Sequence, residues 1–130
     1  MSREVQLEKS TMIVSETDLK GNILYVNNDF CKIAGYTKDE LIGQPHNIVR
    51  HQDMPKVAFK DLWDTVLAGK TWNGIVKNNT KSGDFYWVNA TAYGVTKQNG
   101  EKRILSVRVK PTSDEVENAT KLYKELRKGE

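Results

Sequence analysis

The chain has 130 residues, 38% hydrophobic and 28% charged, which is typical of one globular domain. Its 20 basic and 17 acidic residues leave a net charge of +3 and are interspersed, so charge gives no support for nucleic-acid binding. With no long apolar run, no secretory leader and a single cysteine, we expect a cytoplasmic domain that has no disulfide or structural zinc and does not itself insert into a membrane.

The pattern predicts alternating strands and helices along the chain. In chain order we expect an N-terminal helix, cap or arm over 1–11, strands at 12–17 and 23–26, two short helices around Gly35, a longer helix between Asp53 and Gly69, strands at 71–79, 84–96 and 102–110, and an amphipathic helix over 113–130. The longer helix is predicted from one apolar face at helical spacing, formed by Phe59, Leu62, Trp63, Val66 and Leu67. The outgoing helix is predicted from an apolar stripe formed by Val116, Ala119, Leu122, Tyr123 and Leu126.

This order of elements predicts an α+β domain: a five-stranded antiparallel sheet with helices packed on one face. Because side chains alternate across a strand, the last three strands divide into two sets. The first set is Trp72, Gly74, Val76, Asn78, Tyr86, Val88, Ala90, Ala92, Ile104, Ser106 and Arg108. The second set is Ile75, Trp87, Tyr93, Leu105, Val107 and Val109.

The second set is also apolar, so something should cover it. The N-terminal arm, the outgoing helix and a second subunit are all candidates. If a homodimer forms, Trp87, Tyr93, Leu105 and Val107 are the expected contact and signalling surface.

The first set contains small residues that leave room for a flat ligand, if the helices pack over it. Gly74, Ala90, Ala92 and Ser106 are these small residues, and Asn78 and Arg108 would be polar groups in an otherwise apolar pocket. The alternative is that the small residues only let the helices approach, while Arg108 extends to solvent.

The segment 43–55, GQPHNIVRHQDMP, concentrates unusual side chains just before the longer helix. Arg50 suits a phosphate or carboxylate, and His46 and His51 suit ring stacking or hydrogen bonds. The alternative is a solvated loop in which Asp53 caps the helix. One histidine would suffice for a haem, whereas zinc would need more ligands.

We find no motif for catalysis. The sequence contains no nucleophile motif, no paired carboxylates in the predicted pocket and no phosphate-binding glycine loop, so we do not expect an enzyme. Cys31 fits a small buried apolar residue better than a reactive thiol.

Three motifs resemble those of PAS domains: DLKGNILYVNNDF at 18–30, GYTKDELIG at 35–43 and KSGDFYW at 81–87. The resemblance covers about 12–112, which makes 1–11 an N-terminal cap or arm and 113–130 an outgoing signalling helix. The segment 43–55, followed by WNGIVKN at 72–78, resembles more narrowly the N-terminal FAD-binding sensory domain of bacterial aerotaxis receptors.

The resemblance implies a set of cofactor-binding residues. Arg50, His51 and Asp53 would help to hold the flavin, and Trp72 and Asn78 would lie near its ring. The candidates near these positions are His46, Asn47, Phe59, Trp63 and Arg108, although the aromatic residues of the longer helix also suit plain core. FMN, haem or no cofactor are the alternatives to FAD.

The blue-light LOV branch of the family gives a further comparison. His46 stands where LOV domains carry the cysteine that attacks the flavin, so we expect no photoadduct. Asn78 matches a ring contact of LOV domains, whereas Val88 and Arg108 replace an asparagine and a glutamine. Arg108 would favour an anionic reduced flavin, because a nearby cation stabilises negative charge.

The sequence therefore predicts a non-enzymatic redox or oxygen sensor that binds FAD. As in aerotaxis receptors, it would pass the redox state of the flavin to a downstream chemotaxis module of a longer, membrane-anchored protein. A PAS module that binds no cofactor and acts by dimerisation is the first alternative. A haem-based gas sensor that uses His46 or His51 is the second.

Overall fold

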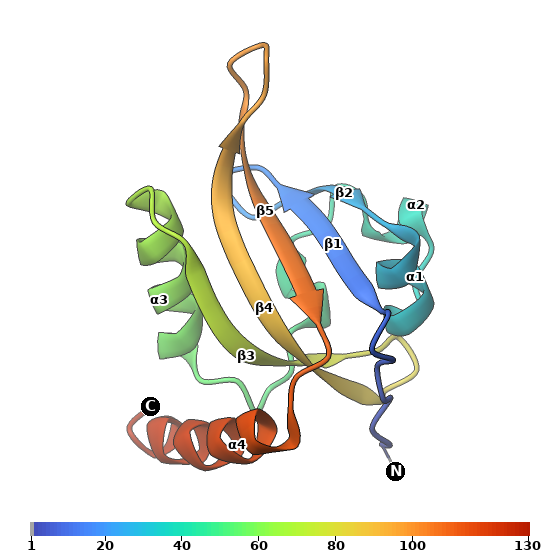
Figure 1. Cartoon of the computed structure of the whole chain (residues 1–130), viewed down its shortest axis with the longest axis vertical. Coiled ribbons are helices and arrows are strands. Elements are labelled where there is room, and N and C mark those ends of the chain that lie inside the picture. Colours follow the sequence, from blue (N-terminus) through green and yellow to red (C-terminus); the bar gives the residue numbers. More distant parts are fainter. Residues whose placement is uncertain (1) are drawn as a thin grey trace.

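The computed structural model describes residues 2–130 and contains one five-stranded antiparallel sheet (Figure 1). The strands are β1 (Met12–Thr17), β2 (Ile23–Val26), β3 (Trp72–Asn79), β4 (Phe85–Thr96) and β5 (Lys102–Val109). Their order across the sheet is β2-β1-β5-β4-β3, so the first strand lies beside the last. The predicted fold class is confirmed.

The helices between β2 and β3 form the second layer of the domain (Figure 1). They are α1 (Asn28–Ala34), α2 (Lys38–Leu41), the 3₁₀ helix η1 (His46–Val49) and α3 (Lys56–Leu67), and α4 (Ser113–Lys128) follows the sheet. The sequence did not predict η1. The alternative in which Asp53 caps the longer helix is wrong, because Pro55 is the N-cap of α3.

The short helices begin and end at the residues that the sequence indicates. The side chain of Asn27 accepts a hydrogen bond from the backbone N–H of Phe30, and Gly35 ends α1 at a φ of 81°. Thr37 and Glu40 form a reciprocal capping box at the start of α2. These local bonds turn the chain back along the sheet, so that η1 and α3 close over its centre.

The predicted division of the sheet into two faces is confirmed. Val76, Asn78, Tyr86, Val88 and Ile104 are buried on the helix side, as are the other members of their set except Gly74, which is partly buried. On the opposite face Tyr93, Leu105 and Val107 are partly exposed. Trp87 differs from its neighbours, because only 8% of it is exposed within the single chain.

Trp87 is covered by the N-terminal arm and by α4, which are two of the three candidates expected to cover the outer face. The described part of the arm, residues 2–11, is not helical: the N–H of Val5 donates to the carbonyl of Phe85, and Leu7 is 3% exposed. Trp87 lies beside this arm and Val116 of α4. It therefore offers little surface to a second subunit, in contrast to the expectation.

Helix α4 crosses the free edge of β3 beside the start of α3 (Figure 1). The Tyr123 hydroxyl donates to the carbonyl oxygen of Ile75 at 2.5 Å, which occupies a backbone acceptor on this edge. Ala119 and Tyr123 are buried as expected, whereas Leu122 is 54% exposed. The predicted apolar stripe of α4 is thus only partly used within the chain.

Candidate functional site: a cationic cavity between the sheet and α3

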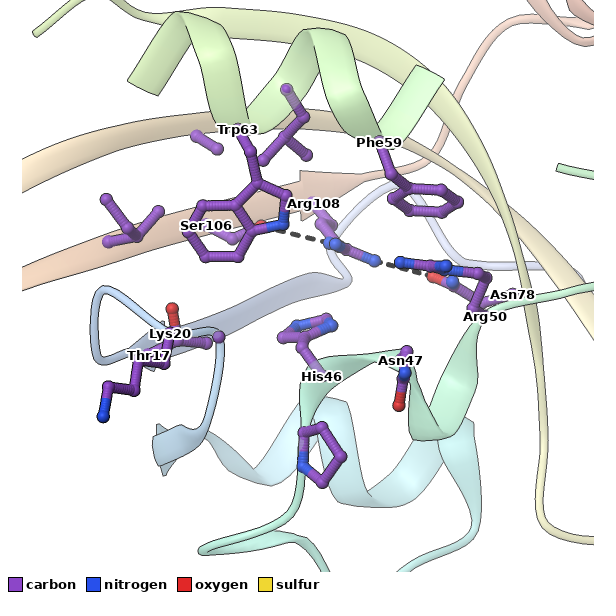
Figure 2. Close-up of a pocket in the computed structure, with 15 residues that line it drawn as sticks. Thr17, Lys20, His46, Asn47, Arg50, Phe59, Trp63, Asn78, Ser106 and Arg108 are labelled. Carbon is purple, nitrogen blue, oxygen red and sulfur yellow. Dashed lines mark hydrogen bonds between the residues drawn. The ribbon is translucent and has the colours of Figure 1, made fainter. Parts of the chain in front are cut away.

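A cavity of about 150 Å³ lies between the inner face of the sheet and α3 (Figure 2). Four parts of the chain line it: the end of β1 with the turn after it, the segment that contains η1, one face of α3 and the inner faces of β3, β4 and β5. The lining residues are Thr17, Lys20, Gly21, Pro45, His46, Asn47, Arg50, Phe59, Leu62, Trp63, Asn78, Ala92, Ile104, Ser106 and Arg108.

Arg108 forms the floor of the cavity together with two neighbours. Its Nε donates to Ser106 Oγ at 3.0 Å, and its Nη1 donates to Asn78 Oδ1 at 2.7 Å. Both partners are neutral and buried, and burial lowers the pKa of Arg108. A guanidinium has five N–H donors, so these two bonds leave donors for another acceptor. The alternative in which Arg108 extends to solvent is wrong, because Arg108 is only 6% exposed.

His46 stands on the opposite wall of the cavity, close to β1. Its Nε2 lies 3.1 Å from Ser15 Oγ, and its ring makes an edge contact with Phe30 at a centroid distance of 5.8 Å. Burial, followed by the positive charge of Arg108, lowers the pKa of His46 to about 3. The imidazole is therefore neutral at physiological pH and can offer a polar nitrogen without adding charge.

Arg50 reaches into the cavity from the end of η1. Its guanidinium carbon lies 3.8 Å from the centre of the Phe59 ring, a cation–π contact with the first turn of α3. The backbone of Arg50 is fixed beside β3, because its carbonyl accepts from Asn79 Nδ2 at 3.1 Å. The sheet therefore holds the main chain, while the charged group faces the cavity.

Trp63 packs on Gly21, and both residues line the cavity. A Cβ atom at Gly21 would lie 3.0 Å from Trp63 Cζ2, so the indole packs directly on the glycine backbone. Gly21 also has a φ of +90°, which side chains rarely adopt. An aromatic ring packed on a glycine backbone therefore forms this part of the cavity wall.

The cavity carries positive charge without a matching acid. Lys20, Arg50 and Arg108 line it, and no Asp or Glu is among the described lining residues. A buried cation that lacks an acidic partner is costly, unless a ligand supplies the negative charge. Together with the aromatic rings of Phe59 and Trp63, this composition suits a flat ligand that carries an anionic group.

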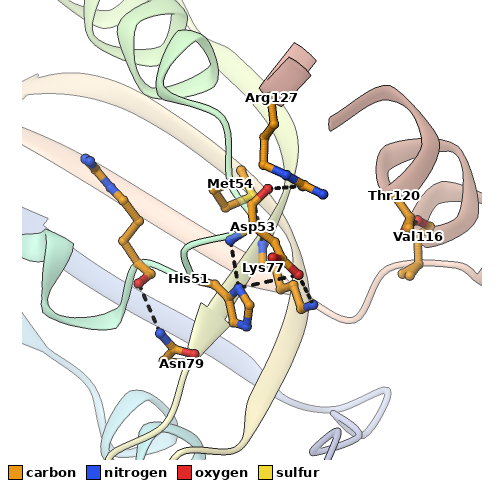
Figure 3. Close-up of polar contacts among 9 residues, drawn as sticks. His51, Asp53, Met54, Lys77, Asn79, Val116, Thr120 and Arg127 are labelled. Atoms are coloured by element: carbon orange, nitrogen blue, oxygen red, sulfur yellow. Dashed lines mark hydrogen bonds and ion pairs between the residues drawn. The ribbon is translucent and has the colours of Figure 1, made fainter. Parts of the chain in front are cut away.

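Three of the predicted cofactor residues lie outside the lining of the cavity. His51 faces away toward Phe85, and its Nδ1 accepts from the backbone N–H of Asp53 at 2.9 Å (Figure 3). Burial, followed by the charge of Lys77, lowers the pKa of His51. Asp53 pairs with Lys77 Nζ at 2.8 Å, which holds the pKa of this carboxyl below its ordinary value.

Trp72 is the third residue outside the cavity. Its Nε1 donates to Asp61 of α3 at 2.9 Å, and its ring occupies the space above Gly74, where a Cβ would approach within 2.4 Å. The room that the sequence reserves at Gly74 is therefore filled by Trp72 and not by a ligand. Ala92 and Ser106, in contrast, do line the cavity.

The structure brings together seven of the predicted cofactor residues and adds others. His46, Asn47, Arg50, Phe59, Trp63, Asn78 and Arg108 are those that line the cavity. Sequence reasoning missed Thr17, Lys20 and Gly21, because it assigned the turn after β1 only to a hairpin. The positive charge and the glycine within this turn were the available signals.

No helix in residues 2–130 is long and apolar enough to span a bilayer. The same residues contain no cluster of three or more His, Cys, Asp or Glu side chains that could hold a metal ion.

Comparison with known proteins places the chain in a family. A protein-family model described as the PAS fold matches residues 23–115, so this chain belongs to the PAS family. It is 45% identical over 123 residues to the aerotaxis receptor of Escherichia coli, a match that covers 95% of this chain and 24% of the receptor. The narrower resemblance predicted from the sequence is confirmed.

Two further comparisons extend this result. The chain is 28% identical over 95 residues to the nitrogen fixation regulatory protein of Klebsiella oxytoca, with 73% of this chain and 19% of that protein covered. It superposes on the light-state structure of the blue-light photoreceptor Aureochrome1 LOV with a TM-score of 0.72 at 17% identity, covering 92% of this chain and 93% of that one. The chain thus spans about a quarter or less of these curated relatives, and the structural likeness shows the fold alone.

Proposed function

We propose that this domain is a non-enzymatic redox or oxygen sensor that binds FAD in the cavity between the sheet and α3. The observation that carries the proposal is a cavity lined by Lys20, Arg50 and Arg108 without any acid. The 45% identity to an aerotaxis receptor, and the fold shared with a LOV photoreceptor, support a flavin as the ligand. When bound, a flavin supplies reversible electron transfer.

The lining residues fit a flavin in both charge and shape. Arg50 and Lys20, the two exposed cations of the lining, suit the phosphates. Phe59 and Trp63 suit the faces of the ring. Asn78 and the free donors of Arg108 suit the polar edge of the ring. Arg108 would then stabilise the negative charge that reduction adds.

The three predicted residues outside the cavity act indirectly in this proposal. His51 and Asp53 fix the backbone that follows Arg50, because they hydrogen-bond within this segment and to Lys77 of β3. Trp72 holds α3 against the sheet through Asp61. All three would position the cavity wall without touching the ligand.

The sensor would be one part of a longer cytoplasmic or membrane-anchored receptor. The relatives that it matches are several times longer than this chain, which supports a downstream module in the same protein. We propose that this module receives the signal through the outer face of the sheet and through α4. The partly exposed Tyr93, Leu105 and Val107 would also contact a second subunit.

A module without a cofactor is the second candidate, and the size of the cavity favours it. At about 150 Å³ the cavity is smaller than ligand pockets of roughly 300 Å³ and more. A flavin therefore requires movement of the cavity wall, for example where Trp63 packs on Gly21. Haem has less support, because His51 lies outside the cavity and Nε2 of His46 contacts Ser15.

Titration of the ligand-free domain with FAD, FMN and riboflavin tests the proposal. We expect FAD to bind, and Arg50→Gln to weaken FAD binding by about tenfold, because a charge-assisted hydrogen bond contributes about 1.5 kcal/mol or more. The affinity for riboflavin, which lacks phosphate, should fall less in Arg50→Gln than the affinity for FAD. Arg103→Gln, on the opposite face beside Glu16, is the matched control. Failure of all three flavins to bind would favour the module without a cofactor.

A further inference from the structure

Helix α3 begins without a cap of its own. Its N-cap is Pro55, which makes no side-chain hydrogen bond, and its first turn contains no acidic residue. The first N–H groups of a helix have no partner within the helix, and the positive end of the helix dipole favours an anion there. The start of α3 therefore requires an acceptor from elsewhere in the chain.

Glu130, two residues after the end of α4, supplies that acceptor. The carboxylate of Glu130 accepts from the backbone N–H of Lys56 at 3.1 Å and from that of Val57 at 3.2 Å. One side chain thus occupies two free donors of α3 from more than 70 residues away in the sequence. These two N–H groups of α3 have this acceptor only while Glu130 stays docked.

A second contact joins the same two segments. The guanidinium of Arg127 donates to the backbone carbonyl of Asp53, two residues before the N-cap of α3 (Figure 3). Arg127 is partly buried at this contact, and Asp53 is itself fixed by Lys77. The C-terminal segment 127–130 therefore binds both the residues before α3, through Arg127, and its first turn, through Glu130.

These contacts lie one helical turn from the cavity. The segment 50–57 starts at Arg50, whose guanidinium lies in the cavity, and ends where Glu130 binds. Phe59 is in the first turn of α3 and packs under Arg50. Any loosening of the start of α3 therefore moves the ring and the cation that form this wall.

We infer that the C-terminal segment 127–130, the last residues of α4 and the two that follow, is a latch whose docking through Glu130 and Arg127 orders the cavity wall at Arg50 and Phe59. Undocking removes the cap of α3 and loosens this wall. By linkage, a ligand that needs the ordered wall favours docked α4, and undocking weakens that ligand. This route runs through the start of α3 and does not require the sheet to move. Only the ligand part of the inference rests on the proposed function.

Hydrogen exchange of the ligand-free chain tests the latch. We expect Glu130→Ala to speed the exchange of the amides from Lys56 to Phe59 by roughly fivefold, the effect typical of a lost helix cap. The sheet amides should be unchanged. Glu125→Ala is the matched control, because this residue lies in the same part of α4 and pairs only locally with Lys128. Equal exchange in both variants would overturn the latch.

Arg127→Gln provides an independent variant of the same latch. We expect it to speed exchange at the same α3 amides and in the last two turns of α4. If exchange increases only in α4, the latch does not order the cavity wall and the inference is wrong.

The affinity for FAD tests the link to the cavity separately. We expect Glu130→Ala to bind FAD about threefold more weakly than Glu125→Ala, since the start of α3 must be ordered on binding. Equal FAD affinities, with faster exchange in α3, would contradict the coupling. If neither variant nor the parent chain binds FAD, the proposed function fails, and the exchange of Lys56 to Phe59 still decides whether the latch exists.

Discussion

Arg108 illustrates how a single residue can serve binding at the expense of stability. It is buried against Ser106 and Asn78, both neutral, so its charge has hydrogen bonds but no acidic partner among the described lining residues. Isolated buried charge costs free energy, and residues at binding sites often carry such a cost. The position of Arg108 is easier to explain by a ligand than by packing.

We therefore predict opposite effects of Arg108→Gln on stability and on the flavin. The free energy of unfolding of the ligand-free domain should rise by about 1 kcal/mol, because glutamine keeps a donor without the buried charge. The reduction potential of bound flavin should fall by roughly 30 mV or more, which is about 1.4 kcal/mol for a two-electron couple. Urea denaturation and a redox titration measure the two quantities. An unchanged potential would contradict the role of Arg108.

The two histidines predict a pH dependence of stability. Burial lowers the pKa of both His46 and His51 below the ordinary value of 6.5, so the unfolded chain binds more protons than the folded chain below that pH. Stability should therefore fall as the pH decreases from 7 to 5.5, by about 1 kcal/mol from His46, and His51 acts in the same direction. Denaturation at both pH values tests this, and His46→Gln should reduce the loss. A pH-independent stability between these values would contradict the assignment.

At the scale of elements, Trp72 links the edge of the sheet to α3. Its ring lies over Gly74 and its Nε1 bonds to Asp61, so the glycine is required by close packing and not by backbone conformation. This contact keeps α3 at the distance from the sheet that leaves the cavity open. The indole of Trp72 thus fills the space at Gly74 that the sequence predicts to be open to a ligand.

Gly74→Ala should therefore destabilise the domain by roughly 1–3 kcal/mol, because the new methyl group displaces Trp72. The matched control is Gly94→Ala on β4, where a Cβ would meet nothing within 4 Å. That change should have little effect, or should stabilise slightly by restricting the unfolded chain. Thermal unfolding of both variants provides the measurement. A similar effect at the two glycines would contradict the packing of Trp72.

The sequence was sufficient to predict the elements whose signals are local. The capping residues Asn27 and Thr37, the glycine that ends α1 and the alternation of the last three strands all act within a few residues. The cap of α3 was not predictable, since Glu130 lies far along the chain from Lys56. The contact of His46 with Ser15 was missed for the same reason.

The candidate site was predicted in part for comparable reasons. Asn78 and Arg108 follow from strand alternation. Their hydrogen bond does not follow from strand pairing, because Arg108 lies level with Ala90 whereas Asn78 lies level with Tyr86. The outward rotation of His51 depends on its bond to the Asp53 amide, which no spacing rule indicates. The covering of Trp87 depends on where the arm crosses β4, a tertiary contact.

At the scale of the whole molecule, the outer face of the sheet is only partly covered. The arm and α4 cover Trp87, while Leu105 and Tyr93 remain partly exposed and lie opposite each other on β5 and β4. Adjacent apolar side chains on one sheet face commonly mark a contact between proteins. This remaining surface is the place for the proposed second subunit.

If a homodimer forms there, Leu105→Lys should shift it to the monomer, because the lysine charge would be buried in the contact. Leu19→Lys is the matched control: Leu19 is 45% exposed in the turn after β1, away from this face. Sedimentation of the parent and both variants at equal concentration measures the effect. A parent chain that stays monomeric at high concentration would remove the basis for this dimer.

The central claim is that the cationic cavity binds a flavin, and an absorption spectrum of the freshly purified domain tests it most directly. We predict a flavin band near about 450 nm, and FAD as the chromophore released by heat and identified by chromatography. A Soret band would instead indicate haem. A colourless domain that also takes up no added FAD would contradict the proposal and leave the module without a cofactor as the better account.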